Sequence, residues 1–266
     1  MLIPIWNFLP TSWWSKKKFI VGGNWKMNGS QKIVRMIFQR LKNAEIRSDT
    51  EVFVAVPTIY LEYSKKLCPR RIQLAAQNCY KFKRGSFTGE TSPMMLKDMG
   101  VNWVILGHSE RRTLFGETNE LVAEKVEAAK KCNLKIVACI GETLADKQNR
   151  KTHQVISDQV CAIAEKLNGD WTNVVLAYEP VWAKSSGHKL SPKEVQDMHA
   201  WIKDWIGNNV CPEISNCVRI IFGGRVTGRN CRKLSEEPDV DGFLVSGACL
   251  TSEFLEIINL KSLLNS

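Results

Sequence analysis

The sequence lacks any run of apolar residues that approaches the roughly 20 needed to cross a bilayer. Its apolar start, Met1–Trp14, contains two prolines and is followed by Lys16–Lys18, whereas a secretory signal carries its positive charge first. We expect residues 1–18 to form a loosely ordered extension that does not act as a membrane anchor. The alternative is an interfacial anchor, with tryptophans among the lipid headgroups and the lysines on acidic lipid.

Patterns that bind metals or build disulfide frameworks are also missing. The nine cysteines include no Cys-x-x-Cys pair, and the four histidines form no cluster in the sequence. An odd number of cysteines, placed within apolar segments such as those around Cys139 and Cys161, is typical of reduced and buried thiols. We therefore expect a cytoplasmic protein without a metal site.

The chain has no long block of one charge, although 37 Lys and Arg against 27 Asp and Glu give a formal net charge of +10. Short basic pairs, such as Lys65-Lys66 and Lys130-Lys131, fall at expected helix ends, where the helix dipole favours cations. Solvated helix faces account for this pattern, so we expect no nucleic-acid partner. Association with nucleic acid through bulk charge is the alternative.

Length and composition fit one folded domain. The 266 residues are 44% hydrophobic and 24% charged, near the globular average, and single α/β barrels reach roughly 250 residues. Eight short apolar runs, continuous rather than alternating, are typical of parallel strands buried on both faces. The eight runs are Phe19–Gly22, Val52–Val56, Ile72–Ala76, Asn102–Leu106, Lys135–Ile140, Val174–Tyr178, Val218–Phe222 and Gly242–Val245.

Segments with helical periodicity separate these runs. Ser191-Pro192-Lys193-Glu194 opens one of them with a capping serine, proline at the first helical position and glutamate at the third. Strands alternating with helices predict an α/β fold, a single (β/α)8 barrel over residues 19–264. An open doubly wound sheet is the alternative, but Gly22–Lys26 after the first strand lacks the GxGxxG spacing of its phosphate turn.

Polar residues follow the predicted strands at the rim where such a barrel places its chemistry. Glu179 precedes Pro180, which holds it in an extended conformation. One lysine, one histidine and one carboxylate at one rim suit proton removal beside a carbonyl, because one group takes the proton while another polarises the oxygen. A surface lysine and a structural histidine are the plainer alternatives. The residues at the rim are Asn24, Lys26, Asn78, His108, Glu110, Glu142, Glu179, Gly223-Gly224-Arg225 and Ser246-Gly247, of which Glu142 is interpreted as structural.

Several motifs together resemble the triosephosphate isomerase family, in order and at matching spacing over Phe19–Leu260. Because several of them reach six or more residues in register, the resemblance is specific. The motifs are VGGNWKMNG (Val21–Gly29), QNCY…GSFTGE (Gln77–Glu90), LGHSERR (Leu106–Arg112), CIGE (Cys139–Glu142), AYEPVWA (Ala177–Ala183) and DGFLVSGA (Asp241–Ala248).

The resemblance implies interconversion of dihydroxyacetone phosphate and glyceraldehyde 3-phosphate through an enediolate, without a cofactor. Glu179 matches the base that moves the proton, and His108 matches the neutral imidazole that polarises the carbonyl. This family is itself a standard example of such pKa tuning. Lys26 matches a cation that attracts the phosphate and the developing charge. Asn24 matches an amide that orients substrate oxygen, and Glu110 matches a carboxylate behind the histidine.

The segment Gln77–Glu90, with Thr88 near its tip, is similar to the loop that each subunit of the family inserts into its neighbour's active site. The resemblance therefore implies a homodimer.

The phosphate-binding end departs from the family pattern. Ser185 stands at a lid glycine, Phe222 replaces a tyrosine whose hydroxyl latches the closed lid, and Arg225 replaces a serine. Ser246 also replaces a glycine next to Gly247, where backbone approaches phosphate. We expect an isomerase whose lid closes differently over the active site and whose activity is reduced. In this interpretation the Arg225 guanidinium also binds phosphate. The alternative is a catalytically weak or inactive barrel that acts as a binding or regulatory paralogue.

Overall fold

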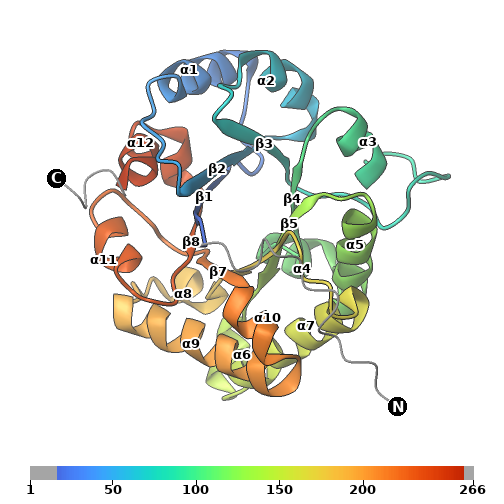
Figure 1. Ribbon diagram of the computed structural model, residues 1–266, viewed down its shortest axis with the longest axis vertical. Coiled ribbons are helices and arrows are strands. Elements are labelled where there is room, and N and C mark those ends of the chain that lie inside the picture. The colour runs from blue at the N-terminus through green and yellow to red at the C-terminus, as the bar shows by residue number, and fades with distance from the viewer. Residues whose placement is uncertain (1–16, 261–266) are drawn as a thin grey trace.

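The computed structural model describes residues 17–260, except for the side chains of Lys184 and Ser185. Eight parallel strands close into a barrel in sequence order, with β8 paired to β1 (Figure 1). The (β/α)8 prediction is confirmed, and the open sheet was the wrong alternative. The strands are β1 (Phe19–Asn24), β2 (Thr50–Ala55), β3 (Ile72–Ala76), β4 (Trp103–Leu106), β5 (Lys135–Ile140), β6 (Val174–Tyr178), β7 (Arg219–Phe222) and β8 (Gly242–Val245).

Helices surround the barrel as an outer ring (Figure 1). The capping box predicted from Ser191 and Glu194 opens the longest of them, with both reciprocal bonds present. The helical elements are α1 (Gln31–Leu41), η3 (Thr58–Tyr60), α2 (Leu61–Leu67), α3 (Pro93–Asp98), α4 (Ser109–Phe115), α5 (Asn119–Lys131), α6 (Leu144–Gln148), α7 (Thr152–Leu167), α8 (Val181–Ser186), α9 (Pro192–Asn209), α10 (Pro212–Cys217), α11 (Cys231–Ser235), η4 (Gly247–Leu250) and α12 (Glu253–Ile258).

The hydrophobic core has two shells, one inside the barrel and one between the barrel and the helices. Inside the barrel the rings of Phe53 and Trp103 stack with centroids 4.8 Å apart. Because alternate residues of each strand enter one shell or the other, both strand faces are apolar. This explains why the sequence shows continuous apolar runs rather than alternation.

Two strands extend beyond their apolar runs. β1 continues to Asn24, which pairs with Ala55, and β2 begins at Thr50 rather than Val52. The charged residue that this adds to β2, Glu51, accepts bonds from Lys135 and Arg219 at 2.7 and 3.0 Å. Partners on β5 and β7, which do not pair with β2, thus let a carboxylate occupy a strand position that lies outside the apolar run.

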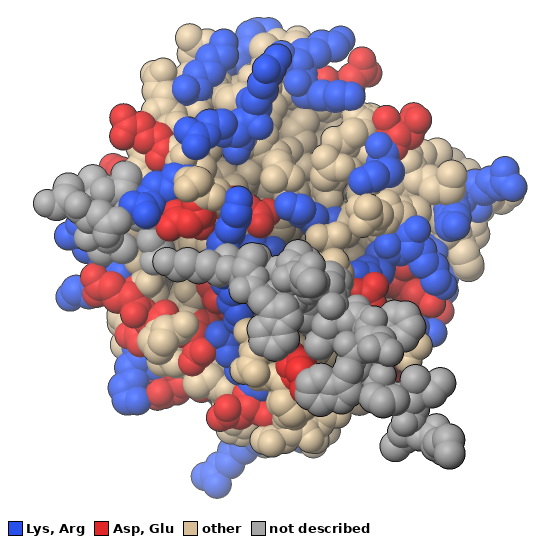
Figure 2. Space-filling view, viewed as in Figure 1, with Lys and Arg blue, Asp and Glu red and all other residues tan. Residues whose placement is uncertain are grey.

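The extension predicted over residues 1–18 lies mostly outside the described residues, which start at Lys17. The Lys17 Nζ donates to the carbonyl oxygen of Val218 at 3.0 Å, just before β7. Within residues 17–260, no helix is long and apolar enough to span a membrane. Basic and acidic side chains are interspersed over the face of the molecule in Figure 2.

Candidate active site

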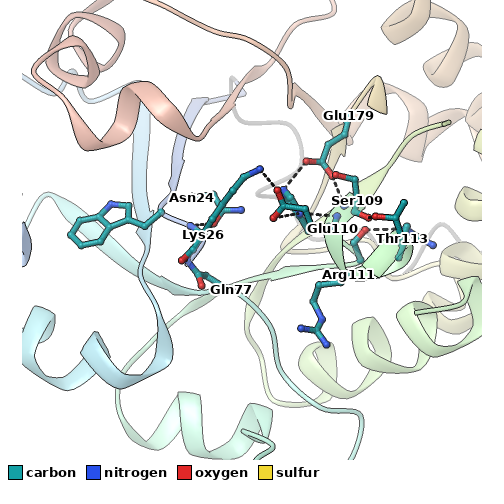
Figure 3. A network of polar contacts seen from close by, with 12 residues as sticks. Asn24, Lys26, Gln77, Ser109, Glu110, Arg111, Thr113 and Glu179 are labelled. Atoms are coloured by element: carbon teal, nitrogen blue, oxygen red, sulfur yellow. Dashed lines mark hydrogen bonds and ion pairs between the residues drawn. The ribbon is translucent and has the colours of Figure 1, made fainter. Parts of the chain in front are cut away.

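Four candidate residues meet at the carboxyl-terminal rim of the barrel. Asn24 ends β1 and Lys26 lies two residues beyond it, while His108 caps α4 after β4 and Glu179 directly follows β6. Asn24, His108 and Glu179 are buried polar residues, with 5%, 5% and 7% of their surface exposed. Figure 3 shows Asn24 and Lys26 on one side, facing Glu110 and Glu179 on the other.

The imidazole of His108 contacts the carboxylate of Glu179 directly. Its Nε2 lies 3.0 Å from Oε1 of Glu179. Its Nδ1 accepts a hydrogen bond from the backbone N–H of Glu110 at 3.2 Å. Because a neutral imidazole has one donor and one acceptor nitrogen, this pattern assigns the proton to Nε2. His108 thus presents an N–H to the rim when it is neutral.

Glu179 is held by two donors at once. Besides His108, the backbone N–H of Ser109 donates to its Oε2 at 2.9 Å. Burial by itself would raise the pKa of this carboxyl, but the bonds and charge of His108, the Ser109 N–H and the Lys26 charge outweigh it and lower the pKa. The side chain is therefore a carboxylate at neutral pH, able to accept a proton.

Two glycines make room for Glu179. A Cβ on Gly223 would lie 2.8 Å from the Glu179 Cγ, and one on Gly141 would lie 1.8 Å from its carbonyl oxygen. Since Cβ atoms do not approach neighbours this closely, a larger residue at position 223 shifts the Glu179 side chain, and one at position 141 shifts the Glu179 backbone. The ends of β5 and β7 thus fix the position of Glu179 from both sides.

Lys26 adopts a left-handed backbone conformation, with φ of 53°, which is uncommon outside glycine. Its backbone N–H donates to Asn24 Oδ1 at 3.0 Å, and the side chain of Gln77 donates to its carbonyl oxygen at 2.9 Å. Its Nζ forms an ion pair with Glu110, whose other oxygen lies 3.7 Å from His108 Nδ1. These contacts fix the lysine beside the histidine.

Gln77 and Ser109 were missed as site residues from the sequence. Gln77 directly follows β3, so the rule that strand ends carry the chemistry applies to it as well. Ser109 acts through its backbone N–H, for which the sequence carries no side-chain signal. A capped helix start directly after a strand is the signal that would have pointed to it.

The candidates for phosphate binding are arranged more loosely. Strand register places Ser246, after β8, beside the end of β1, because Gly23 pairs with Val245. Arg225 and Gly247 are exposed, and Ser246 is half-buried. Ser185 lies in α8, but its side chain is outside the described part of the chain. The Phe222 ring is buried and packs against Gly224.

A hollow of about 380 Å³ opens beside Lys26 and His108, and none of the phosphate-binding candidates lines it. Its lining includes Asn24, Lys26, His108 and Glu110, together with Gly89–Thr91 from the segment that follows β3. The volume suits a small-molecule ligand. Polar and charged side chains therefore converge on a space that a small anion can enter.

Among residues 17–260, no group of three His, Cys, Asp or Glu side chains is placed to hold a metal ion. The chemistry visible at the rim is that of a carboxylate, an imidazole N–H and an ammonium group. A sequence model described as triosephosphate isomerase matches residues 19–261, which is most of the chain. The chain therefore belongs to the triosephosphate isomerase family.

Proposed function

We propose that this protein interconverts dihydroxyacetone phosphate and glyceraldehyde 3-phosphate. The observation that carries the proposal is the pairing of His108 Nε2 with Glu179 Oε1 at 3.0 Å, beside Lys26, at the rim of the barrel. A carboxylate and an imidazole N–H in contact supply the base and the hydrogen-bond donor that enolisation needs. The substrate's own carbonyl is the electron sink, so the reaction needs no cofactor.

In the proposed mechanism, the substrate carbonyl oxygen takes the place of Glu179 as the acceptor of the His108 N–H. The freed carboxylate removes a proton from the adjacent carbon, and the electron pair moves onto the carbonyl oxygen. Lys26 and His108 then stabilise the enediolate charge. His108 Nε2–H gives its proton to the carbonyl oxygen while Nε2 takes the proton of the neighbouring hydroxyl, so the negative charge moves to the second oxygen. Glu179 then returns its proton to the neighbouring carbon as the second oxygen becomes the new carbonyl, which completes the isomerisation. Asn24 orients the substrate oxygen, and Glu110 holds Lys26 and lies behind His108.

The phosphate group is proposed to bind at Arg225, Ser246, Gly247 and the backbone near Ser185. An exposed guanidinium forms paired, charge-assisted hydrogen bonds with phosphate, whereas the family uses backbone N–H groups there. Phe222 offers no hydroxyl to latch a closed lid, and one lost hydrogen bond costs about 0.5–1.5 kcal/mol. We therefore propose reduced activity relative to family members with the usual pattern.

We also propose a homodimer. Residues 77–92, between β3 and α3, project beyond the ring of helices in Figure 1, and Thr88 is exposed within them. Next to the hollow, Met27 and Phe115 are 97% and 65% exposed, and such apolar surface is typical of a partner-binding face. Sedimentation of the parent and Thr88→Arg proteins tests this: the variant should sediment as a monomer, and an unchanged mass would contradict the proposed loop.

A cytoplasmic location is proposed as well, because all nine cysteines are free thiols, as in a reducing compartment. Cell fractionation tests this location. Recovery of the protein in a secreted or membrane fraction would contradict it.

A coupled assay on the purified protein, with glyceraldehyde 3-phosphate as substrate, tests the proposed activity. Isomerisation that saturates with substrate supports it. The altered phosphate end favours a second candidate, a barrel that binds phosphorylated ligands without turning them over. Background turnover at high substrate, together with retained ligand binding, would favour that second candidate.

A further inference from the structure

An amide outside the strand ends binds the backbone beside Glu179. Gln159 lies on α7 and is 6% exposed. The backbone N–H of Gly141 donates to its Oε1 at 2.7 Å, and its Nε2 donates to the Gly141 carbonyl oxygen at 3.1 Å. One side chain thus bonds to both polar backbone groups of a single residue 18 positions away in the sequence.

Packing alone does not require an amide at this position. The buried face of α7 is otherwise apolar and includes Ile156, Val160 and Ile163 at helical spacing around Gln159. An apolar side chain would continue that face, whereas a buried amide is costly unless it is hydrogen-bonded. The two bonds to Gly141 are therefore what distinguishes glutamine from an apolar residue here.

Gly141 connects this amide to Glu179. β5 pairs with β6 as far as Ile140, so Gly141 lies just beyond the strand ladder and takes its hydrogen bonds from Gln159 instead. The Glu179 N–H donates to the Ile140 carbonyl oxygen at 2.8 Å. A Cβ on Gly141 would overlap the Glu179 carbonyl oxygen, so the two backbones are in close contact. A shift of the peptide after β5 therefore moves the backbone that carries the Glu179 side chain.

The amide is also neutral, which matters beside a carboxylate. Gln159, Gly141 and Glu179 line one small cavity of about 80 Å³. An ionised carboxylate at position 159 would lie near the Glu179 charge and would raise the pKa of Glu179. Gln159 supplies an acceptor and a donor to Gly141 without adding such a charge.

We propose that Gln159 is a positioning residue for Glu179. By holding the peptide at Gly141, it keeps the carboxylate oxygens 3.0 Å from His108 Nε2 and 2.9 Å from the Ser109 nitrogen. The effect on turnover rests on the proposed isomerase activity, whereas the effect on the carboxylate itself does not. Gln159 acts only through Glu179 and does not touch the substrate.

Gln159→Met tests this role, because methionine keeps the length of the side chain and removes both hydrogen bonds. Gln154→Met, at an exposed position of the same helix, is the matched control. We expect kcat to fall about tenfold in Q159M, with KM within about twofold of the parent, since a small misplacement of a reacting group costs up to about 10²-fold in rate. Q154M should match the parent in both constants.

Two further measurements separate positioning from general destabilisation. In the Glu179→Gln background, Q159M should lower kcat by less than about twofold, because a residue that acts through the carboxylate then has nothing left to position. Carbon NMR of the labelled Glu179 carboxyl needs no turnover. Its titration midpoint should move to higher pH in Q159M, because weaker bonds from His108 and Ser109 stabilise the carboxylate less.

A parent-level kcat together with a parent-level midpoint in folded Q159M would overturn the inference while leaving the isomerase intact. An equal loss of kcat from Q159M in the parent and E179Q backgrounds would also overturn it, because Gln159 would then act independently of Glu179. If Q159M failed to fold, Gln159→Leu would take its place, with the same expectations. If the parent showed no isomerisation, the proposed function would fail and the NMR midpoint alone would decide the inference.

Discussion

At the end of the site proposed for proton transfer, His108 and Glu179 are 5% and 7% exposed and bonded to each other. At the end proposed for phosphate, Arg225 and Gly247 are exposed. Groups that are already oriented and desolvated stabilise developing charge without reorganising. An exposed arginine must instead lose side-chain freedom when it binds. The comparison teaches that the His108–Glu179 pair is already set in the folded chain, whereas the contacts proposed for phosphate would form on binding.

The largest effect is expected when the proposed base is removed. Glu179→Gln keeps the size of the side chain and an oxygen for the His108 N–H, but an amide cannot take up the proton. We expect kcat to fall by about 10³-fold with KM little changed. The coupled assay measures this, with Glu62→Gln on the exposed face of α2 as the matched control. Parent-level turnover in E179Q would show that another group is the base.

The next effect tests how rigidly the proton-transfer end is set. In Gly223→Ala the added Cβ would lie 2.8 Å from the Glu179 Cγ, so the carboxylate must shift. A small misplacement of a reacting group costs up to about 10²-fold in rate, and we expect a loss in kcat between about 10- and 100-fold. Gly207→Ala, in α9 and with a nearest contact at 3.5 Å, is the control and should match the parent. Equal activity in G223A would mean that the site is looser than its packing indicates.

A smaller effect is expected at the phosphate end. Arg225→Ser removes the guanidinium, and we expect KM to rise about tenfold, which is the value of one charge-assisted hydrogen bond, while kcat changes less. Higher salt should narrow the difference between R225S and the parent, because screening weakens exposed charges. Arg229→Ser, also exposed, is the matched control. An unchanged KM in R225S would place the phosphate away from residue 225.

The subtlest prediction concerns pH. The lowered pKa of Glu179 means that its carboxylate persists below the ordinary pKa of 4.5. Its contribution to stability is present above that ordinary value and is lost as pH falls through the lowered one. Carbon NMR of the labelled carboxyl measures the titration directly. His108→Gln should move the midpoint to higher pH, and a midpoint in the parent above 4.5 would contradict the assigned partners.

Much of the fold follows from the sequence because buried parallel strands leave continuous apolar runs. Four of the eight runs, among them Ile72–Ala76 and Gly242–Val245, coincide with observed strands. The limits of β2 differ because Glu51 gains partners from β5 and β7, which lie far away in sequence. The start of β2 therefore depends on contacts between residues far apart in sequence, which the local hydropathy pattern does not show.

The candidate site could be predicted where side chains carry it. His108 and Glu179 stand at strand ends and have the chemistry that the rim needs. The Ser109 N–H, the positive φ of Lys26 and the fit of Gly223 against Glu179 are properties of the folded backbone. Residue type alone does not show them, so they appear only once the strands have closed into a barrel.

The most direct test of the account is a calorimetric titration, near neutral pH, with a phosphate-bearing carboxylate that mimics the enediolate. If the Lys26, His108 and Glu179 groups and the phosphate contacts face one space, the mimic should bind at least about 100-fold more tightly than inorganic phosphate. Equal affinity for the mimic and for inorganic phosphate would show that the two ends do not act on one ligand, and would contradict the account.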